Sequence, residues 1–237
     1  MSGHSKWATI KRSKGAADAK RAVLFTKLAK NISVAARQGK DPVMNPSLRE
    51  AIDKARASSM PKDNIERAVL RGAGELPGQT LEEMTYEGHG PGGVAFYILT
   101  VTDNSNRTVQ ELKRLLSSHG GSLGGPGAVA WMFQRKGVLR YAQLNDEQEL
   151  VAIDAGAEDI QRETEGVTVL TPPDLLETVK TAVACGAGIP LSAGVEYVPN
   201  TQQEVSDPKM KEQLENMYEE LESSEDVSEF FDNAKLV

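Results

Sequence analysis

Residues 137–198 determine the fold class of this chain, and they read GVLRYAQLNDEQELVAIDAGAEDIQRETEGVTVLTPPDLLETVKTAVACGAGIPLSAGVEYV. Short runs rich in β-branched and aromatic residues predict four strands, at 137–141, 157–162, 167–171 and 195–198. Helical periodicity predicts two helices between them, at 146–155 and 174–184, which end at Gly156 and Gly186. The resulting order, β-α-β-β-α-β, is that of a ferredoxin-like unit.

The segments on either side of this unit complement each other. Residues 84–87 and 94–101 (VAFYILTV) predict strands, and the second is apolar enough to be central. A capping box at 108–111 predicts a helix, and a glycine-rich loop at 120–127 leads to a strand at 129–133. This β-β-α-β region lacks a closing helix, which residues 208–222 can supply, with the tail 225–237 completing the same domain. The ferredoxin-like unit is therefore expected to be an insertion.

The N-terminal third predicts short helices around a small core. A helix at 19–37 has an apolar arc and ends near Gly39. Asn45 and Pro46 have the pattern of an N-cap followed by a proline at the first helical position. A third helix at 63–71 ends at Gly72, and the turn-forming residues 74–79 (GELPGQ) form a linker.

These elements predict an α+β protein with a small N-terminal helical bundle and two α/β sandwich domains, one of them ferredoxin-like and inserted in the other. The basic helical domain is expected at 1–78. The middle α/β domain is expected at 79–135 plus 203–237, and the inserted ferredoxin-like domain at 136–202.

Charge is distributed very unevenly along the chain. The whole sequence of 237 residues has 27 basic and 34 acidic residues and a net charge of −7. Residues 1–72 alone have 16 basic and 6 acidic residues, a net charge of +10, which leaves −17 on the remainder. Such asymmetry indicates a polyanion-binding module attached to acidic domains.

The candidate nucleic-acid-binding residues are therefore in the N-terminal segment. Each neutralised phosphate releases a counterion and adds to affinity, so a dense cluster of lysine and arginine suits a polyphosphate. Trp7 could stack on a base or equally pack in the helical bundle. The expected contacts are His4, Lys6, Trp7, Lys11, Arg12, Lys14, Lys20, Arg21, Lys27, Lys30 and Arg37.

Other kinds of site find little support in the sequence. One cysteine excludes an intramolecular disulfide, and three dispersed histidines do not have zinc-ligand spacing. The glycine-rich stretches 88–93 and 120–127 do not lead from a strand into a helix, so we interpret them as turns and not as phosphate cradles. Asp103 and Arg107 lie where a predicted strand ends and a helix begins, which is a common position for functional residues. Helix capping and local hydrogen bonding explain these two residues equally well. We therefore predict no catalytic residues, no metal site and no cofactor.

Several blocks of sequence closely resemble the YebC/PmpR family. They are GHSKW at 3–7, IKRSKGAADAKRAVLFTKLAK at 10–30, MPKDNIERA at 60–68, YEGHGPGG at 86–93, TDNSNRT at 102–108 and MFQRKG at 132–137. The resemblance spans essentially the whole chain and implies three domains, a helical one and two α/β ones. Ser13 and Gly15 depart from the family pattern, where many members have another basic residue and an alanine.

The resemblance implies a DNA-binding transcriptional regulator of the bacterial cytoplasm. Related mitochondrial members are translational activators, and bacterial members have been tied to the ribosome. The leading hypothesis is a non-enzymatic nucleic-acid-binding regulator of gene expression that acts on DNA. The alternative is a ribosome-associated translation factor that binds rRNA, with a ribosomal or protein partner on the acidic domains. An enzyme using the cleft between the two α/β domains is the third hypothesis, and it lacks a catalytic set. No membrane partner is expected, and no particular oligomeric state is predicted.

Overall fold

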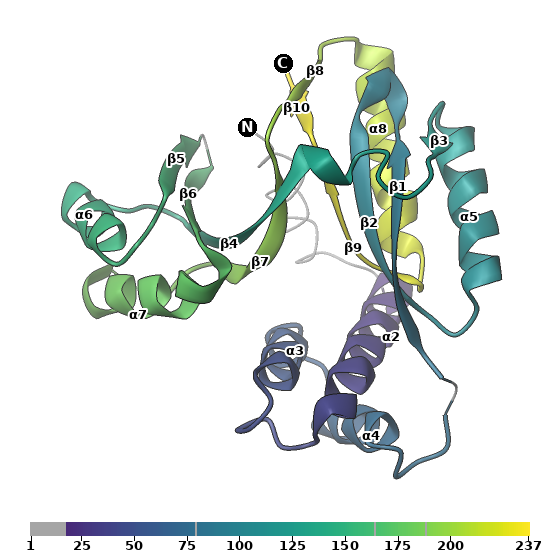
Figure 1. Cartoon of the computed structure of the whole chain (residues 1–237), viewed down its shortest axis with the longest axis horizontal. Coiled ribbons are helices and arrows are strands. Elements are labelled where there is room, and N and C mark those ends of the chain that lie inside the picture. The colour runs from purple at the N-terminus through teal and green to yellow at the C-terminus, as the bar shows by residue number, and fades with distance from the viewer. Residues whose placement is uncertain (1–17, 79, 164, 188) are drawn as a thin grey trace.

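The computed structural model describes residues 18–78, 80–163, 165–187 and 189–237 and arranges them in three bodies (Figure 1). A helical body lies at the lower end of the view, and a sheet flanked by long helices stands above it. A second sheet with its own helices projects to the left. The molecule is therefore a mixed α+β protein, as the sequence predicts.

The helical body is formed by α2 (Asp18–Ala35), a short 3-10 turn η2 (Ala36–Gln38), α3 (Pro46–Ala57) and α4 (Lys62–Gly72). Its core consists mainly of Leu28, Ile32, Leu48, Ile52 and Ile65. These residues recur at helical spacing on each segment, and their burial holds the three helices together.

Two local features of the helical body follow from single residues. Asn45 caps α3 by accepting a hydrogen bond from the Leu48 N–H at 3.1 Å, and Pro46 occupies the first turn, both as predicted. Helix α4 ends at Gly72, as predicted, and this last residue packs against α2. A Cβ on Gly72 would lie 2.1 Å from the Ser33 carbonyl oxygen, so this glycine permits the close approach of the two helices. Ala73 is the C-cap of α4, and Gly74 follows it with a φ of +76°, the left-handed conformation that often follows a helix end.

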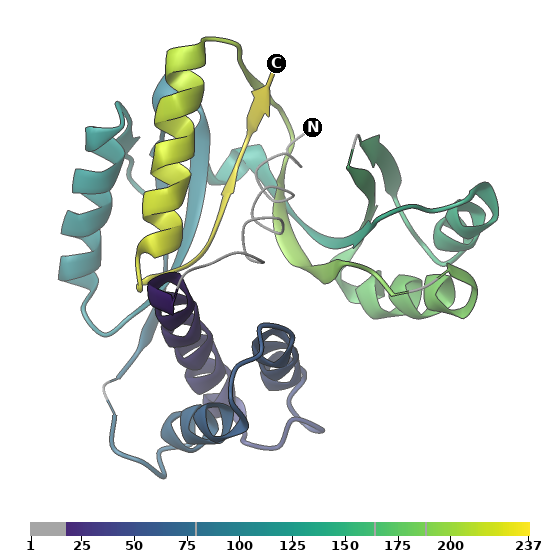
Figure 2. The ribbon, with the colours of Figure 1, turned by 180° about the vertical axis from the view of Figure 1, so that it is seen from behind.

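The middle body is a sheet of order β3-β1-β2-β9, with α5 and α8 on one face. Figure 2 shows α8 in front of the strands with α5 beside it. The core between them includes Phe96, Ile98, Leu116, Leu214 and Met217. The element bounds are β1 (Glu82–His89), η3 (Pro91–Gly93), β2 (Ala95–Thr102), α5 (Ser105–Ser118), β3 (Ser122–Leu123), η4 (Ala130–Met132), α8 (Pro208–Ser223) and β9 (Val227–Asp232). A small parallel pair, β8 (Gln203–Val205) with β10 (Ala234–Leu236), closes this body.

The third body has the predicted β-α-β-β-α-β order. Its sheet has the strand order β5-β6-β4-β7 and is antiparallel throughout, as in a ferredoxin-like unit. Helices α6 and α7 pack on one face around Leu139, Val169 and Val179. The bounds are β4 (Phe133–Tyr141), α6 (Asp146–Asp154), β5 (Asp159–Glu163), β6 (Gly166–Thr171), η5 (Pro173–Leu175), α7 (Leu176–Ala187) and β7 (Ser192–Pro199).

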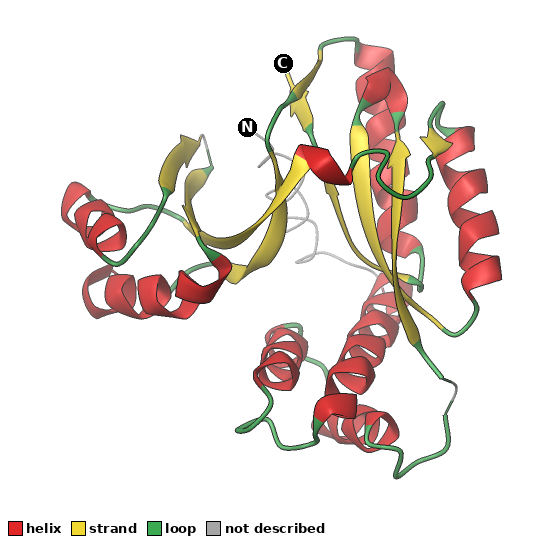
Figure 3. Cartoon of the chain, viewed as in Figure 1, coloured by secondary structure: helices red, strands yellow, loops and turns green. Residues whose placement is uncertain are grey.

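Strands β4 and β7 continue from the ferredoxin-like sheet to the middle body, as Figure 3 shows. Aromatic side chains meet where they arrive. The Tyr197 ring lies 4.5 Å from Tyr97 and 5.5 Å from Phe231, between ring centroids, and the Phe133 ring lies 5.9 Å from Tyr97. The predicted domain boundary after residue 135 falls inside β4, so this strand serves both bodies; the three domain ranges themselves stay predictions.

Three predicted elements differ from the structure. The strand expected at 129–133 is the 3-10 turn η4, and β4 runs without a break from Phe133 to Tyr141. Helix α5 begins at Ser105 because Asn104 caps it, so Thr108 is a buried residue of the first turn and not an N-cap. Helix α7 continues past Gly186 to Ala187.

Candidate nucleic-acid interface

The basic residues expected to contact nucleic acid fall into two groups in this structure. His4, Lys6, Trp7, Lys11, Arg12 and Lys14 lie outside the described residues. Lys20, Arg21, Lys27, Lys30 and Arg37 lie on α2 and η2. Lys20 and Arg21 are exposed in the first turn of α2 and extend the basic segment that precedes the helix.

Lys27 and Lys30 are engaged with the acidic C-terminal segment. The Lys27 Nζ donates to the Glu222 carbonyl at 2.6 Å and to the Leu221 carbonyl at 3.4 Å. These carbonyls belong to the last turn of α8, where they have no partner within the helix. Burial lowers the pKa of Lys27 to about 8, against the opposing effect of Glu222. The sequence predicts Lys27 as a phosphate contact. In the structure its ammonium group instead donates hydrogen bonds to the carbonyls of the last turn of α8.

Lys30 reaches Asp226 beyond the end of α8. Its Nζ lies 2.7 Å from the Asp226 Oδ1 and donates to the Glu225 carbonyl at 3.0 Å. The two side chains are only 16% and 4% exposed, so this ion pair is largely shielded from water. We therefore leave Lys27 and Lys30 out of the proposed interface.

Asp226 joins several elements at one carboxylate. Besides Lys30, it accepts from the Arg107 guanidinium at 3.0 Å, from Thr108 Oγ1 at 2.8 Å and from Thr102 Oγ1 at 3.1 Å. Burial alone would raise the pKa of this carboxyl, but Lys30, Thr108 and Arg107 hold it at about 2. The position of Arg107 after a strand is thus explained by structure, because it ties α5 to the C-terminal segment.

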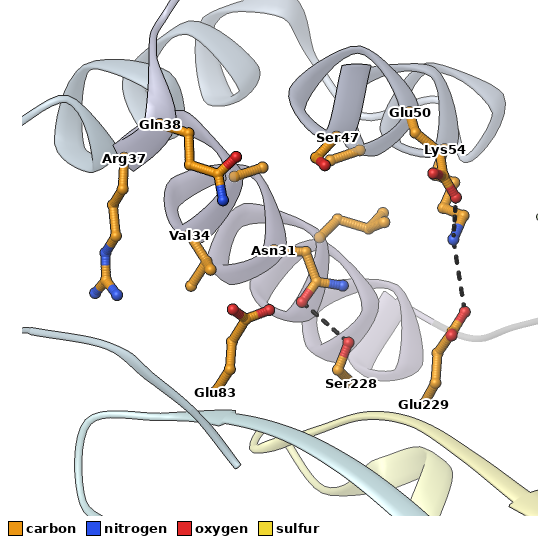
Figure 4. Close-up of a pocket in the computed structure, with 13 residues that line it drawn as sticks. Asn31, Val34, Arg37, Gln38, Ser47, Glu50, Lys54, Glu83, Ser228 and Glu229 are labelled. Atoms are coloured by element: carbon orange, nitrogen blue, oxygen red, sulfur yellow. Dashed lines mark hydrogen bonds and ion pairs between the residues drawn. The ribbon is translucent and has the colours of Figure 1, made fainter. Parts of the chain in front are cut away.

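Arg37 and the neighbouring cavity mark the inner side of the helical body. Arg37 donates to the Leu81 carbonyl, just before β1. A cavity of about 380 Å³ lies between α2, α3 and the ends of β1 and β9 (Figure 4). Three carboxylates line it, those of Glu50, Glu83 and Glu229, and Lys54 lies between two of them. A cavity with this lining is unfavourable for a polyanion, so phosphates are expected on the outer surfaces of the helices.

Sequence reasoning missed two arginines on such an outer surface. Arg67 and Arg71 are exposed and lie one turn apart on α4, whose buried residues are Ile65 and Ala68. The signal for them was present, since they alternate with the apolar residues of a short amphipathic helix. Charge density alone does not single them out, because the densest cluster of basic residues lies nearer the N-terminus.

Within the described ranges, no group of three or more His, Cys, Asp or Glu side chains is placed to hold a metal ion. None of the helices described here is both long enough and apolar enough to cross a membrane.

Fold and charge together define a class of three-body α+β protein that joins a basic helical body to acidic sheet bodies, one of them ferredoxin-like. Comparison with known proteins agrees. Residues 5–75 match the model of the TACO1/YebC protein N-terminal domain, and residues 81–234 match that of the TACO1/YebC second and third domain. The chain belongs to the TACO1/YebC family.

Curated relatives are similar over their whole length. A protein of Treponema pallidum is 50% identical over 240 residues, covering 100% of this chain and 98% of the relative. One from Chlorobaculum tepidum is 51% identical over 242 residues, covering 100% and 96%. Both bear the name "Probable transcriptional regulatory protein". The crystal structure of a conserved hypothetical protein from Aquifex aeolicus is 38% identical, with a TM-score of 0.82 over 93% of this chain and 92% of that one.

Proposed function

We propose that this protein is a non-enzymatic regulator of gene expression that binds nucleic acid, as a DNA-binding transcriptional regulator, through its basic N-terminal domain. The observation that carries the proposal is the charge of +10 on residues 1–72 against −17 on the remainder. Phosphate contacts supply most of the sequence-independent affinity of such proteins. The names of the relatives from Treponema pallidum and Chlorobaculum tepidum support a role in transcription.

The proposed interface has a defined set of residues. It combines the N-terminal segment with the start of α2 and the outer side of α4, and it excludes the lysines that tie α2 to the acidic segment. Its members are His4, Lys6, Trp7, Lys11, Arg12, Lys14, Lys20, Arg21, Arg67 and Arg71. Arg37 is left out because it donates to the Leu81 carbonyl and lines the cavity that three carboxylates share.

Charge reversal tests this interface. Replacing Lys11, Arg12, Lys14, Lys20 and Arg21 by glutamate should abolish binding to a labelled DNA duplex in fluorescence anisotropy. If about five phosphates are contacted, the logarithm of the wild-type affinity should fall with the logarithm of salt concentration at a slope of roughly −4 to −5.

A matched control reverses lysines on the acidic bodies. Lys113→Glu with Lys209→Glu changes two exposed lysines outside the helical domain and should leave the affinity within roughly twofold. A flat salt dependence, or equal loss in the control, would exclude binding through the N-terminal domain.

A translation factor that binds rRNA is the alternative role, because RNA and DNA backbones are contacted by the same cations. Crosslinking in cells followed by sequencing of the bound nucleic acid separates the two. Promoter DNA is the expected product for transcriptional regulation, and recovery of ribosomal RNA instead would transfer the same interface to translation.

A further inference from the structure

Trp131 is a large aromatic side chain on the surface of the middle body. It is 71% exposed and lies in η4, between the glycine-rich loop at 120–127 and β4. Tryptophan usually contributes to cores or interfaces, because its ring buries a large apolar area. The charge-based interface on the N-terminal domain does not include this residue.

The loop before Trp131 is held by a buried carboxylate. Glu87 on β1 is 8% exposed, and one of its oxygens accepts from the Gly127 N–H at 2.7 Å. Its other oxygen accepts from the N–H groups of Val129 and Ala130, each at 2.7 Å. Burial alone would raise a carboxyl pKa, but these three hydrogen bonds lower the pKa of Glu87 below its usual value. The backbone leading to Trp131 is therefore fixed.

Trp131 is also held from its other side. The Trp131 Nε1 donates to the Ala128 carbonyl at 3.3 Å, which orients the ring. Asn200, after β7, donates from Nδ2 to the Trp131 carbonyl at 3.3 Å and from its backbone N–H to the Met132 carbonyl at 2.8 Å. An exposed ring on so well-supported a backbone loses little conformational freedom when it binds a ligand.

The two chain segments that meet at the Trp131 backbone have no acidic residues, unlike the rest of the acidic bodies. Residues 120–137 and 197–203 contain no aspartate or glutamate. Arg135 is exposed four positions after Trp131, and Lys136 follows it. Gln134, Asn200, Thr201 and Gln202 are exposed polar residues in the same two segments. These two segments thus combine an aromatic ring with a cation and several amides, which matches the chemistry of a nucleotide, a phosphate with a flat base.

Other strongly exposed large apolar side chains of the described chain do not come from this region of sequence. Most are on the loop between α2 and α3, on α6 and on the loop after α7, and another is Val237 after β10; they include Val43, Met44, Leu150, Ile153 and Ile189. A protein-docking surface would be expected to combine an aromatic anchor with further apolar residues. The apolar residues that flank Trp131 in sequence, Ala130 and Met132, are both half-buried, so its own segment favours a nucleic-acid base over an apolar protein segment.

We propose that Trp131 is a base-stacking site for single-stranded nucleic acid, with Arg135 positioned for the adjacent phosphate. The inference rests on the proposed function and adds a second contact, on a different body from the basic helices. A single strand is required because a base can stack on a side chain only when its own face is uncovered.

The test uses the full chain and oligomers of dT and U twelve nucleotides long. The sequence has two tryptophans, so a Trp7→Phe background makes fluorescence report on Trp131 alone. Titration with either oligomer should quench this fluorescence. Trp131→Ala should weaken binding by roughly 5- to 150-fold, and Trp131→Phe, which retains a stacking ring, by less than about threefold. Arg135→Ala should reduce the slope of log affinity against log salt by about 1.

Leu150→Ala is the matched control, because it removes an exposed apolar side chain from α6 and should leave the affinity unchanged. Wild-type affinity in Trp131→Ala, alongside lost affinity in Lys20→Glu with Arg21→Glu, would overturn the stacking site and leave the proposed function standing. Equal losses in the Phe and Ala variants would also overturn stacking. No binding of wild-type protein to any nucleic acid would overturn both. Loss of self-association or protein binding in Trp131→Ala, with oligomer affinity intact, would assign the ring to a protein contact instead.

Discussion

Asp226 is a single carboxylate on which the C-terminal segment, α5 and α2 converge. Its folded pKa of about 2 lies below the ordinary value of 3.8, so it stabilises the fold in its ionised form. This contribution is complete above pH 4 and is lost as the pH falls from 4 to 2. The shift corresponds to about 2 kcal/mol of unfolding free energy.

Asp226→Asn should therefore lower the unfolding free energy by about 1–3 kcal/mol at pH 7, because Lys30 and Arg107 lose their charged acceptor. The difference between variant and wild type should shrink as the pH approaches 2, which urea unfolding at a series of pH values measures. Glu225→Gln is the control, since this exposed side chain is adjacent. A difference that stays constant from pH 7 to pH 2 would contradict the role of the charge.

Glu87 plays a comparable role for the loop that presents Trp131. The Glu87 carboxylate accepts hydrogen bonds from three backbone N–H groups. In Glu87→Gln the amide N–H₂ would face at least one of these N–H groups, which would then lack an acceptor. We expect a loss of about 1–3 kcal/mol and a lower steady-state fluorescence anisotropy of Trp131 in a Trp7→Phe background. Glu83→Gln, on the exposed end of the same strand, should change neither quantity. Unchanged Trp131 anisotropy in Glu87→Gln would show that the loop is held by other contacts.

At the scale of the element, sequence patterns predicted helices and strands well where a local signal had no competitor. Asn45 and Pro46 mark the start of α3 because capping and proline geometry are properties of two neighbouring residues. The capping box at 108–111 was wrong because Asn104 caps the helix first, which leaves the Thr108 hydroxyl to bind Asp226 across 118 positions of chain. Such a distant partner cannot be seen in a local pattern.

The contrast between local signals and distant partners also explains why the turn η4 and the roles of Lys27 and Lys30 were not predicted. Residues 129–133 have the composition of a strand, but Glu87 binds two of their backbone N–H groups and bends them into a turn. The basic N-terminal segment could be identified from charge alone. The inward use of Lys27 and Lys30 could not, because it depends on where α8 ends in space.

Gly72 tests the packing of two elements. Gly72→Ala would place a Cβ 2.1 Å from the Ser33 carbonyl oxygen, so α4 must move away from α2. We expect a loss of roughly 1–3 kcal/mol in chemical denaturation, the usual cost of overpacking. Gly125→Ala is the matched control: a Cβ there meets nothing within 4 Å, and φ is not in the left-handed region, so stability should be unchanged or slightly raised. Equal stability of Gly72→Ala and wild type would contradict the tight α2–α4 contact.

In the whole molecule, helix α2 has exposed cations near its start and partly buried, paired cations in its second half, and we propose that only the exposed ones bind phosphates. Lys20 is exposed near its start, whereas Lys30 is 16% exposed and paired with Asp226. Methionine retains much of the length of either lysine stem while removing its charge, so Lys20→Met and Lys30→Met are a reciprocal pair. Each variant loses one cation, and only its location differs.

Lys30→Met should loosen the helical body from the middle body, because the Asp226 and Glu225 contacts are lost. Amide hydrogen exchange in α2 and at the end of α8 should then rise, while the affinity for a DNA duplex changes by less than roughly twofold. Lys20→Met should do the opposite, with unchanged exchange and an affinity lower by a single phosphate contact, which reduces the salt slope by about 1. If Lys30→Met instead lost a phosphate contact and left exchange unchanged, the inward lysines would belong to the nucleic-acid interface, and the division of α2 between its two ends would be wrong.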